Sequence, residues 1–370
     1  MTTDLTSPSR TTTTDTRLRP APMVAVWVVV GVVVMALCLW AGDGRPVPGP
    51  ADLPDPGLGT QWALPVMRVL ADLAGILTVG LLLVGAVLVP SRSGELHGAS
   101  GRWTRTARWS ALAWACAALT QVVLSLSDIV AEPVSSVLKP ALLWSFVRDV
   151  ELGRALVVQA ALALAVGVGA AVVRTATGAR VVGFVAVGAL MPPILTSHVG
   201  LATDRSLAVV VLLVHVVTVS LWCGGLAALV LVGTTDRTQF PVAVPRFSTL
   251  ALWCAVGVAA SGIVSAWVRL GDVAALVTTS YGRLVVVKLL LITVLSGFGL
   301  WHRRRSMPRL GHDTGRLLFL RVAAVEVVVM AATVGVAVAL ARTPPPGMGD
   351  MPMPLAAPSH VVSATIDLWS

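Results

Sequence analysis

Histidine, methionine and cysteine side chains are concentrated in one stretch of the chain, from Met191 to Gly225. This stretch holds His198 in a short polar turn, and His215 and Cys223 in the long apolar run that follows. Imidazole, thioether and thiol groups suit copper, Cu(I) in particular, better than magnesium or calcium. The stretch therefore predicts a copper site whose first candidate ligands are Met191, His198 and His215.

A pair of prolines, Pro192-Pro193, directly follows Met191. Because proline cannot continue regular helical hydrogen bonding, we expect the outer end of this apolar run to break and fold inward as irregular backbone lining a cavity. His198 then lies on the outer turn. His215 lies nine residues into the next run, which is about 14 Å deep at 1.5 Å per residue. An imidazole near the bilayer midplane is expected to be functional.

Each of these residues also has a structural interpretation. A histidine in a membrane helix often hydrogen-bonds a neighbouring helix, and methionine often only fills space in a core. His215, Thr218, Trp222 and Gly225 share one helical face. Because this face combines polar, aromatic and small residues, it is expected to face protein and not lipid.

Two further sets of soft ligands lie outside this stretch. Cys223 and Cys254 fall at similar depth in consecutive apolar runs, so they either form an inner Cu(I) site or serve as small buried hydrophobic residues. Met348, Met351 and Met353 lie in a Pro/Gly-rich terminal segment without a core to pack in. That segment is either a copper-capturing tail, a disordered tail or a linker.

Charged residues within the apolar runs are costly in a bilayer. Arg68 and Asp72 are spaced to pair on one helical face. Lys288 lies near the start of its run and is expected to extend toward the membrane surface. Glu326 lies deeper, and its expected partner is Lys288 or a proton, so both structural pairing and transport stay open.

Composition defines the class of protein that holds these residues. The chain has 370 residues, of which 56% are hydrophobic and only 12% charged, with a mean hydropathy of +0.86. Its apolar runs are long enough for helices that cross a bilayer of about 30 Å. We therefore predict an all-α polytopic membrane protein. The formal charge of +9 comes from short clusters that suit anionic lipid, and it does not indicate nucleic acid.

We expect about nine transmembrane helices, and a short interfacial helix between 128 and 154. Basic residues number 17 on one set of alternate connections and 8 on the other, which predicts a cytoplasmic N-terminus and an extracytoplasmic C-terminus. The four cysteines lie in apolar runs, which argues against a disulfide framework. The expected spans are 23–40, 66–89, one ending near 128, 152–173, 181–195, 207–232, 247–268, 284–301 and 317–341.

Several motifs lie between about 190 and 341. One helix has the pattern H-x6-W-x-G-G, formed by His215, Trp222, Gly224 and Gly225, and His198 precedes it. Further along the chain are Arg246-Phe247-Ser248, Gly262, Trp267, Tyr281-Gly282-Arg283 and Lys288. On these residues the segment resembles the copper resistance protein D (CopD) family, in which His198 corresponds to the outer histidine.

The resemblance implies a multi-pass plasma-membrane protein that carries copper ions inward, contributing to copper homeostasis. It also implies a soluble extracytoplasmic partner of the CopC type, because this chain contains no CopC-like β-domain. One interpretation makes the chain the N-terminal part of an actinobacterial CopD–CtaG-like fusion. The expected divisions are a disordered cytoplasmic tail over 1–20, N-terminal membrane helices over 21–180, a CopD-like domain over 181–342 and an extracytoplasmic Met/Pro-rich tail over 343–370.

Three functions remain open at this point. The first is a copper permease, and the second is an extracytoplasmic delivery factor that works with cytochrome oxidase assembly proteins. The third, haem-binding electron transfer, is opposed by the different depths expected for His198 and His215. The sequence lacks a P-loop, an Asp-Lys-Thr-Gly motif and a hydrolytic set of residues, so we expect neither an ATP-driven pump nor an enzyme.

Overall fold

The computed structural model describes residues 20–42, 44–50, 53–89, 94–96, 98–196, 205–235, 239–270, 274–306 and 313–343. Regular structure in these ranges is helical, apart from one isolated β-bridge between Glu95 and Thr175. His198 and the tail methionines Met348, Met351 and Met353 lie outside the described residues.

The described residues include nine helices long and apolar enough to cross a membrane. This finding confirms the prediction of an all-α polytopic membrane protein. The placement of the N-terminus in the cytoplasm stays a prediction. The spans are formed by α1 (Pro20–Ala41), α2 (Gly57–Leu83) with the π-helical turn η1 (Val84–Leu88), α3 (Gly98–Val130), α6 (Glu151–Val172), α7 (Ala176–Gly188) with α8 (Pro192–Leu195), α9 (Arg205–Thr235), α10 (Phe240–Leu270), α12 (Ser280–Trp301) and α13 (Asp313–Arg342).

Short elements occupy the connections. Two helices, α4 (Val134–Val137) and α5 (Pro140–Asp149), form between α3 and α6, where the sequence predicts a short helix. A third, α11 (Ala275–Thr278), precedes α12, and a π-helical turn, η2 (His302–Ser306), follows it.

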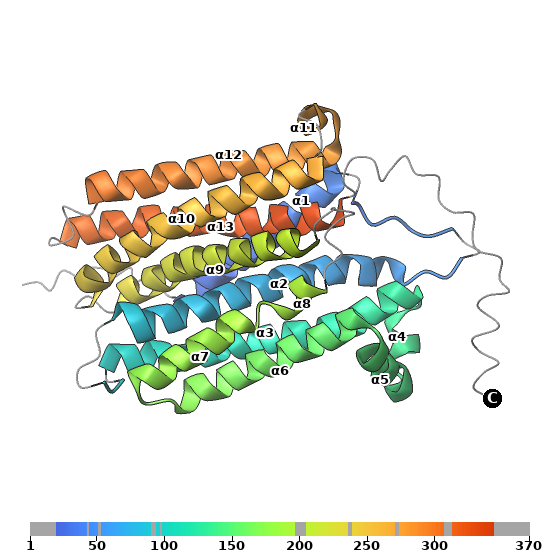
Figure 1. Ribbon diagram of the computed structural model, residues 1–370, viewed down its shortest axis with the longest axis horizontal. Coiled ribbons are helices and arrows are strands. Elements are labelled where there is room, and N and C mark those ends of the chain that lie inside the picture. The colour runs from blue at the N-terminus through green and yellow to red at the C-terminus, as the bar shows by residue number, and fades with distance from the viewer. Residues whose placement is uncertain are drawn as a thin grey trace, which may run out of the picture.

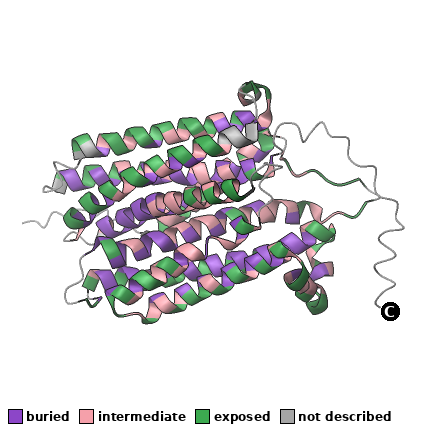
Figure 2. Ribbon diagram, viewed as in Figure 1, coloured by how far each residue is buried: buried purple, intermediate pink, exposed green. Residues whose placement is uncertain are grey.

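Hydrophobicity explains why these residues form helices even where valine dominates. The most apolar window of each span has a mean hydropathy between 1.6 and 2.7. Valine favours strands in water. In hydrocarbon, however, every backbone N–H and C=O must be satisfied within the segment, and only a helix does this for a single span. Many large apolar residues are accordingly exposed, and exposed residues recur along the helices of the bundle (Figure 2).

The helices lie side by side along the long axis of the molecule and pack in two groups (Figure 1). One group contains α2, α3, α6 and α7, while the other contains α1, α9, α10, α12 and α13. The first and last spans, α1 and α13, pack closely against each other. The principal contact between the groups is that of α2 with α9. The helix α9 therefore lies between the two groups, in contact with α2, α10 and α13.

Arginines tie helices together at one end of the bundle, which we call the basic end. It comprises the connections after η1, α6, α9 and α12, which lie at the left of Figure 1. Arg246 Nη1 donates to the carbonyl oxygen of Leu88 at 3.2 Å, and Arg316 Nη1 to that of Gly233 at 2.7 Å. Carbonyls in the last turn of a helix lack helical partners and attract cations. Arg246, which the family resemblance singles out, therefore has a structural role here.

Glycines set the distance between α2 and α9. A Cβ atom added to Gly80 would overlap the backbone of Gly224, and one added to Gly224 would overlap the carbonyl of Ile76. Close backbone contact of this kind is how membrane helices gain packing energy when lipid gives no hydrophobic driving force. The glycine predicted to allow close approach, Gly225, contacts the ring of Phe247 instead.

Replacing Gly80 or Gly224 by alanine should therefore destabilise the protein. The added methyl groups must push two backbones apart, and overpacking typically costs about 1–3 kcal/mol. Thermal unfolding of the purified protein in detergent measures the loss. Gly297→Ala is the control, because a Cβ at Gly297 has no neighbouring atom within 4 Å. Equal melting temperatures for all three variants and the wild type would contradict the close backbone contact between α2 and α9.

Candidate functional site

His215 is held by a serine of the neighbouring helix. Its Nδ1 lies 2.9 Å from Oγ of Ser261 on α10. Oγ of Ser261 also lies 2.6 Å from the Gly257 carbonyl oxygen and 3.2 Å from that of Val258. A hydroxyl has one proton, and Ser261 uses it to donate to its own helix, so it accepts from Nδ1–H of His215.

This arrangement favours the imidazole tautomer with its proton on Nδ1. With the proton on Nδ1, Nε2 of His215 carries the lone pair that a metal ion needs. Histidines that bind metal through one ring nitrogen usually donate the other N–H to a fixed acceptor, which sets both tautomer and orientation. Ser261 gives His215 this support within the membrane-spanning part of α9.

The rest of the predicted face of α9 is also directed toward protein. A Cβ added to Gly257 of α10 would lie 2.8 Å from Cγ2 of Thr218. Trp222 is buried, and Gly225 contacts the α10 residue Phe247. These contacts agree with the expectation that the face avoids lipid.

The prolines break the fifth span, as predicted. Helix α7 ends at Gly188, and Met191 lies in the turn before the short helix α8, which Pro192 begins. Ile194 is buried, and α8 packs against α6 and α9. The break therefore forms a packed turn. The backbone of Met191 forms hydrogen bonds within this turn. A role of Met191 as a copper ligand beside His215 stays a prediction.

The two interior cysteines lie near each other. Cys254 is buried and Cys223 half-buried, and both are free thiols. They are close enough to interact electrostatically. Among the described residues, however, no group of three or more His, Cys, Asp and Glu side chains is placed to hold a metal ion. A soft site at these thiols would have to recruit thioethers or residues outside the described ranges.

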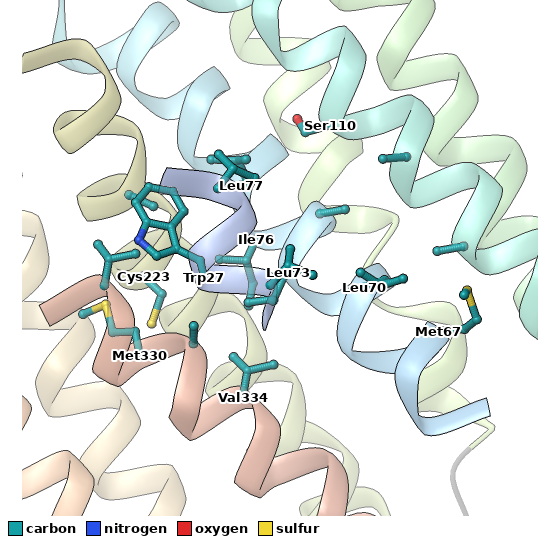
Figure 3. A pocket seen from close by; sticks show the side chains of 18 of the residues that line it. Trp27, Met67, Leu70, Leu73, Ile76, Leu77, Ser110, Cys223, Met330 and Val334 are labelled. Atoms are coloured by element: carbon teal, nitrogen blue, oxygen red, sulfur yellow. The ribbon is translucent and has the colours of Figure 1, made fainter. Parts of the chain in front are cut away.

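A cavity of about 430 Å³ lies beside Cys223 (Figure 3). Its lining is almost entirely apolar and comes from α1, α2, α3, α9 and α13. Met330 and Cys223 share one part of its wall with Trp27, and Met67 lies farther along (Figure 3). This cavity could not be predicted from the sequence, because hydrophobic periodicity does not show which helices lie next to one another.

Lys288 lies close enough to His215 to act on it electrostatically, and its side chain is half-buried. Tyr281 and Arg283 lie on the same helix as Lys288 and contact residues near its start. Thr279 caps α12 by accepting a hydrogen bond from the amide of Gly282 at 3.0 Å. Tyr281 is buried in a small apolar cluster, whereas Arg283 is exposed and donates to Ser280. These two residues therefore stabilise the start of α12.

Glu326 pairs with a residue that the sequence did not single out. Its Oε2 lies 3.3 Å from Nε2 of His302, and both side chains are buried. Glu326 therefore pairs with His302 and not with Lys288. Lys288 lies on α12, 14 residues before His302, which is about four helical turns away. The one signal in the sequence is a histidine that directly ends an apolar run.

Two family models match the chain. The model described as copper resistance protein D matches residues 241–340, and the model described as copper resistance protein D-like, N-terminal domain, matches residues 59–204. No curated protein and no solved structure matches the chain. The two matched regions contain α10, α12 and most of α13 on one side and α2 to α8 on the other. With both parts of the family present in order, the chain belongs to the copper resistance protein D family.

Proposed function

We propose that this protein conducts copper ions across the membrane and that His215 is a central ligand on the path. Family membership indicates a role in copper resistance or uptake. The observation that carries the finer proposal is the hydrogen bond of Nδ1 of His215 to Ser261. It presents Nε2 in the metal-binding state at a depth where an idle imidazole is costly.

Weak, successive coordination suits transport better than one tight site. An ion must bind well enough to enter the membrane and loosely enough to leave. The described residues supply His215 and then Cys223, eight residues farther toward the basic end of α9, which is about 12 Å along the helix. Cys254 is the proposed partner ligand of Cys223 at this second position. Met191, His198 and the tail methionines remain the proposed entry ligands at the opposite end.

The charge of Lys288 favours copper in its lower oxidation state. Lys288 acts electrostatically on His215, so a metal ion on Nε2 would be repelled by the ammonium group. Coulomb repulsion doubles when the charge of the ion doubles. Together with the soft sulfur ligands, this favours Cu(I) over Cu(II) as the transported ion.

The proposal places the protein in the plasma membrane with the basic end in the cytoplasm, following the distribution of basic residues. Copper would then arrive from a soluble CopC-type partner on the other side. Delivery of copper to cytochrome oxidase assembly proteins is the alternative use of the same outer ligands.

Replacing His215 by alanine should reduce copper uptake by cells that express the protein to the background of cells lacking it. Isotope accumulation measures this directly. Val214→Ala is the matched control, because Val214 lies on the same turn and is 45% exposed. Uptake by the His215 variant equal to that of the control would refute transport through His215. Normal cytoplasmic copper with poor oxidase loading would favour delivery instead.

Replacing Ser261 by alanine should weaken copper binding by about 10–100-fold, the usual effect of removing the group that orients a metal-binding histidine. Competition with a Cu(I) chelator on purified protein measures the affinity. Ser296→Ala is the control, since Ser296 is exposed on α12 and donates only within its own helix, to Ile292. Equal affinities for the two variants would show that Ser261 serves packing alone.

A further inference from the structure

Glu326 and His302 form an acid and imidazole pair inside the bundle that copper coordination at His215 does not use. Glu326 is 2% exposed and His302 is 7% exposed. The imidazole packs against the ring of Phe319, with centroids 4.4 Å apart, and against Trp301 at 5.6 Å. The pair is therefore enclosed by aromatic residues and removed from lipid.

The polar atoms of this pair are not satisfied by hydrogen bonds within the described part of the chain. Both ring nitrogens of His302 and Oε2 of Glu326 are buried without a hydrogen-bond partner there, although Nε2 and Oε2 are within ion-pair distance. Such groups destabilise a fold, and apolar residues would pack here at lower cost. Ionisable residues that persist inside a membrane protein commonly serve ion or proton movement.

The position of His302 gives the pair a route to water. His302 begins the π-helical turn η2, and Arg304 and Arg305 within that turn are exposed at the basic end. Single π-helical turns are frequent at functional sites. On α13, Glu326 lies five residues inside the exposed Arg321, or about 7.5 Å along the helix. A proton therefore needs to cross only a short distance between the pair and the aqueous phase.

Few other charges face the pair. The nearest titratable group on α9 is Cys223, and beyond it Cys254 on α10. Arg316, on α13 itself, is directed to the Gly233 carbonyl. Lys288 on α12 lies close to His215 instead. Among the described residues, the ion-pair partner of Glu326 is His302, so the pair is expected to hold one shared proton and no net charge.

We propose that Glu326 and His302 form a proton-binding site that exchanges its proton with water at the basic end. A second part of this inference rests on the proposed function and concerns the role of the site during transport. A monovalent copper ion that reaches this half of the bundle adds one positive charge, and release of one proton from the pair to water removes one. The total charge in the apolar interior is then unchanged, so proton release favours passage of the ion.

Infrared spectra of the purified full-length protein without copper test the proton site directly. When the pH is raised from acidic to alkaline values, the wild type should lose the C=O stretch of a protonated carboxyl group. Glu326→Gln should abolish this band, and His302→Gln should shift its midpoint. Asp72→Asn, in the half-exposed pair with Arg68, should retain it. A band that survives in Glu326→Gln, or no pH-dependent band in the wild type, would overturn the site.

Copper uptake into proteoliposomes at varied internal pH tests the coupling. The wild-type rate should rise with internal pH, because deprotonation of the pair becomes easier, and the Glu326→Gln rate should lose this dependence. An identical pH profile in both proteins would overturn the coupling. Absence of uptake in the wild type would count against the proposed function, while the infrared band would still decide the proton site.

Discussion

The contact between Gly80 and Gly224 fixes the position of α9, the helix that carries His215 and Cys223. It joins α2, the centre of the first helix group, to α9, which belongs to the second. Side chains larger than hydrogen at these positions would separate the groups, since the two backbones already meet. With α9 held between the two groups, the residues on its flanks are fixed against different neighbours. The contact thus determines the relation between the two regions that the family models match.

The position of α9 gives it two chemically distinct sides. Toward α10 it presents His215, whose ring is oriented by Ser261. Toward α1, α2 and α13 it presents Cys223, which lines the apolar cavity. On the proposed path, an ion moving along α9 would leave a polar interhelical contact and meet a sulfur-containing, nearly dry wall. A soft ion of low charge would tolerate this change best, because sulfur ligands suit soft ions and a low charge loses the least solvation energy.

Much of the fold follows from the sequence because a bilayer leaves few alternatives. Hydropathy and length predicted the spans to within a few residues at most ends, and Pro192-Pro193 predicted the break between α7 and α8. The second span begins earlier than expected, at Gly57, because Gln61 and other polar residues extend the helix beyond the apolar run. Ser261 and His302 were missed because their importance depends on which helix lies opposite. Periodicity gives the face of a helix but not its neighbour.

Charged side chains inside the described bundle lie beside other ionisable groups. Arg68 pairs with Asp72, and Glu326 pairs with His302. Lys288 lies close to His215, the proposed copper ligand. On the proposed path, a cation bound at His215 would be repelled by Lys288 and attracted by any negative charge at Glu326, farther toward the basic end. Movement toward the basic end would then be favoured, to an extent that depends on where the proton of the Glu326 and His302 pair resides.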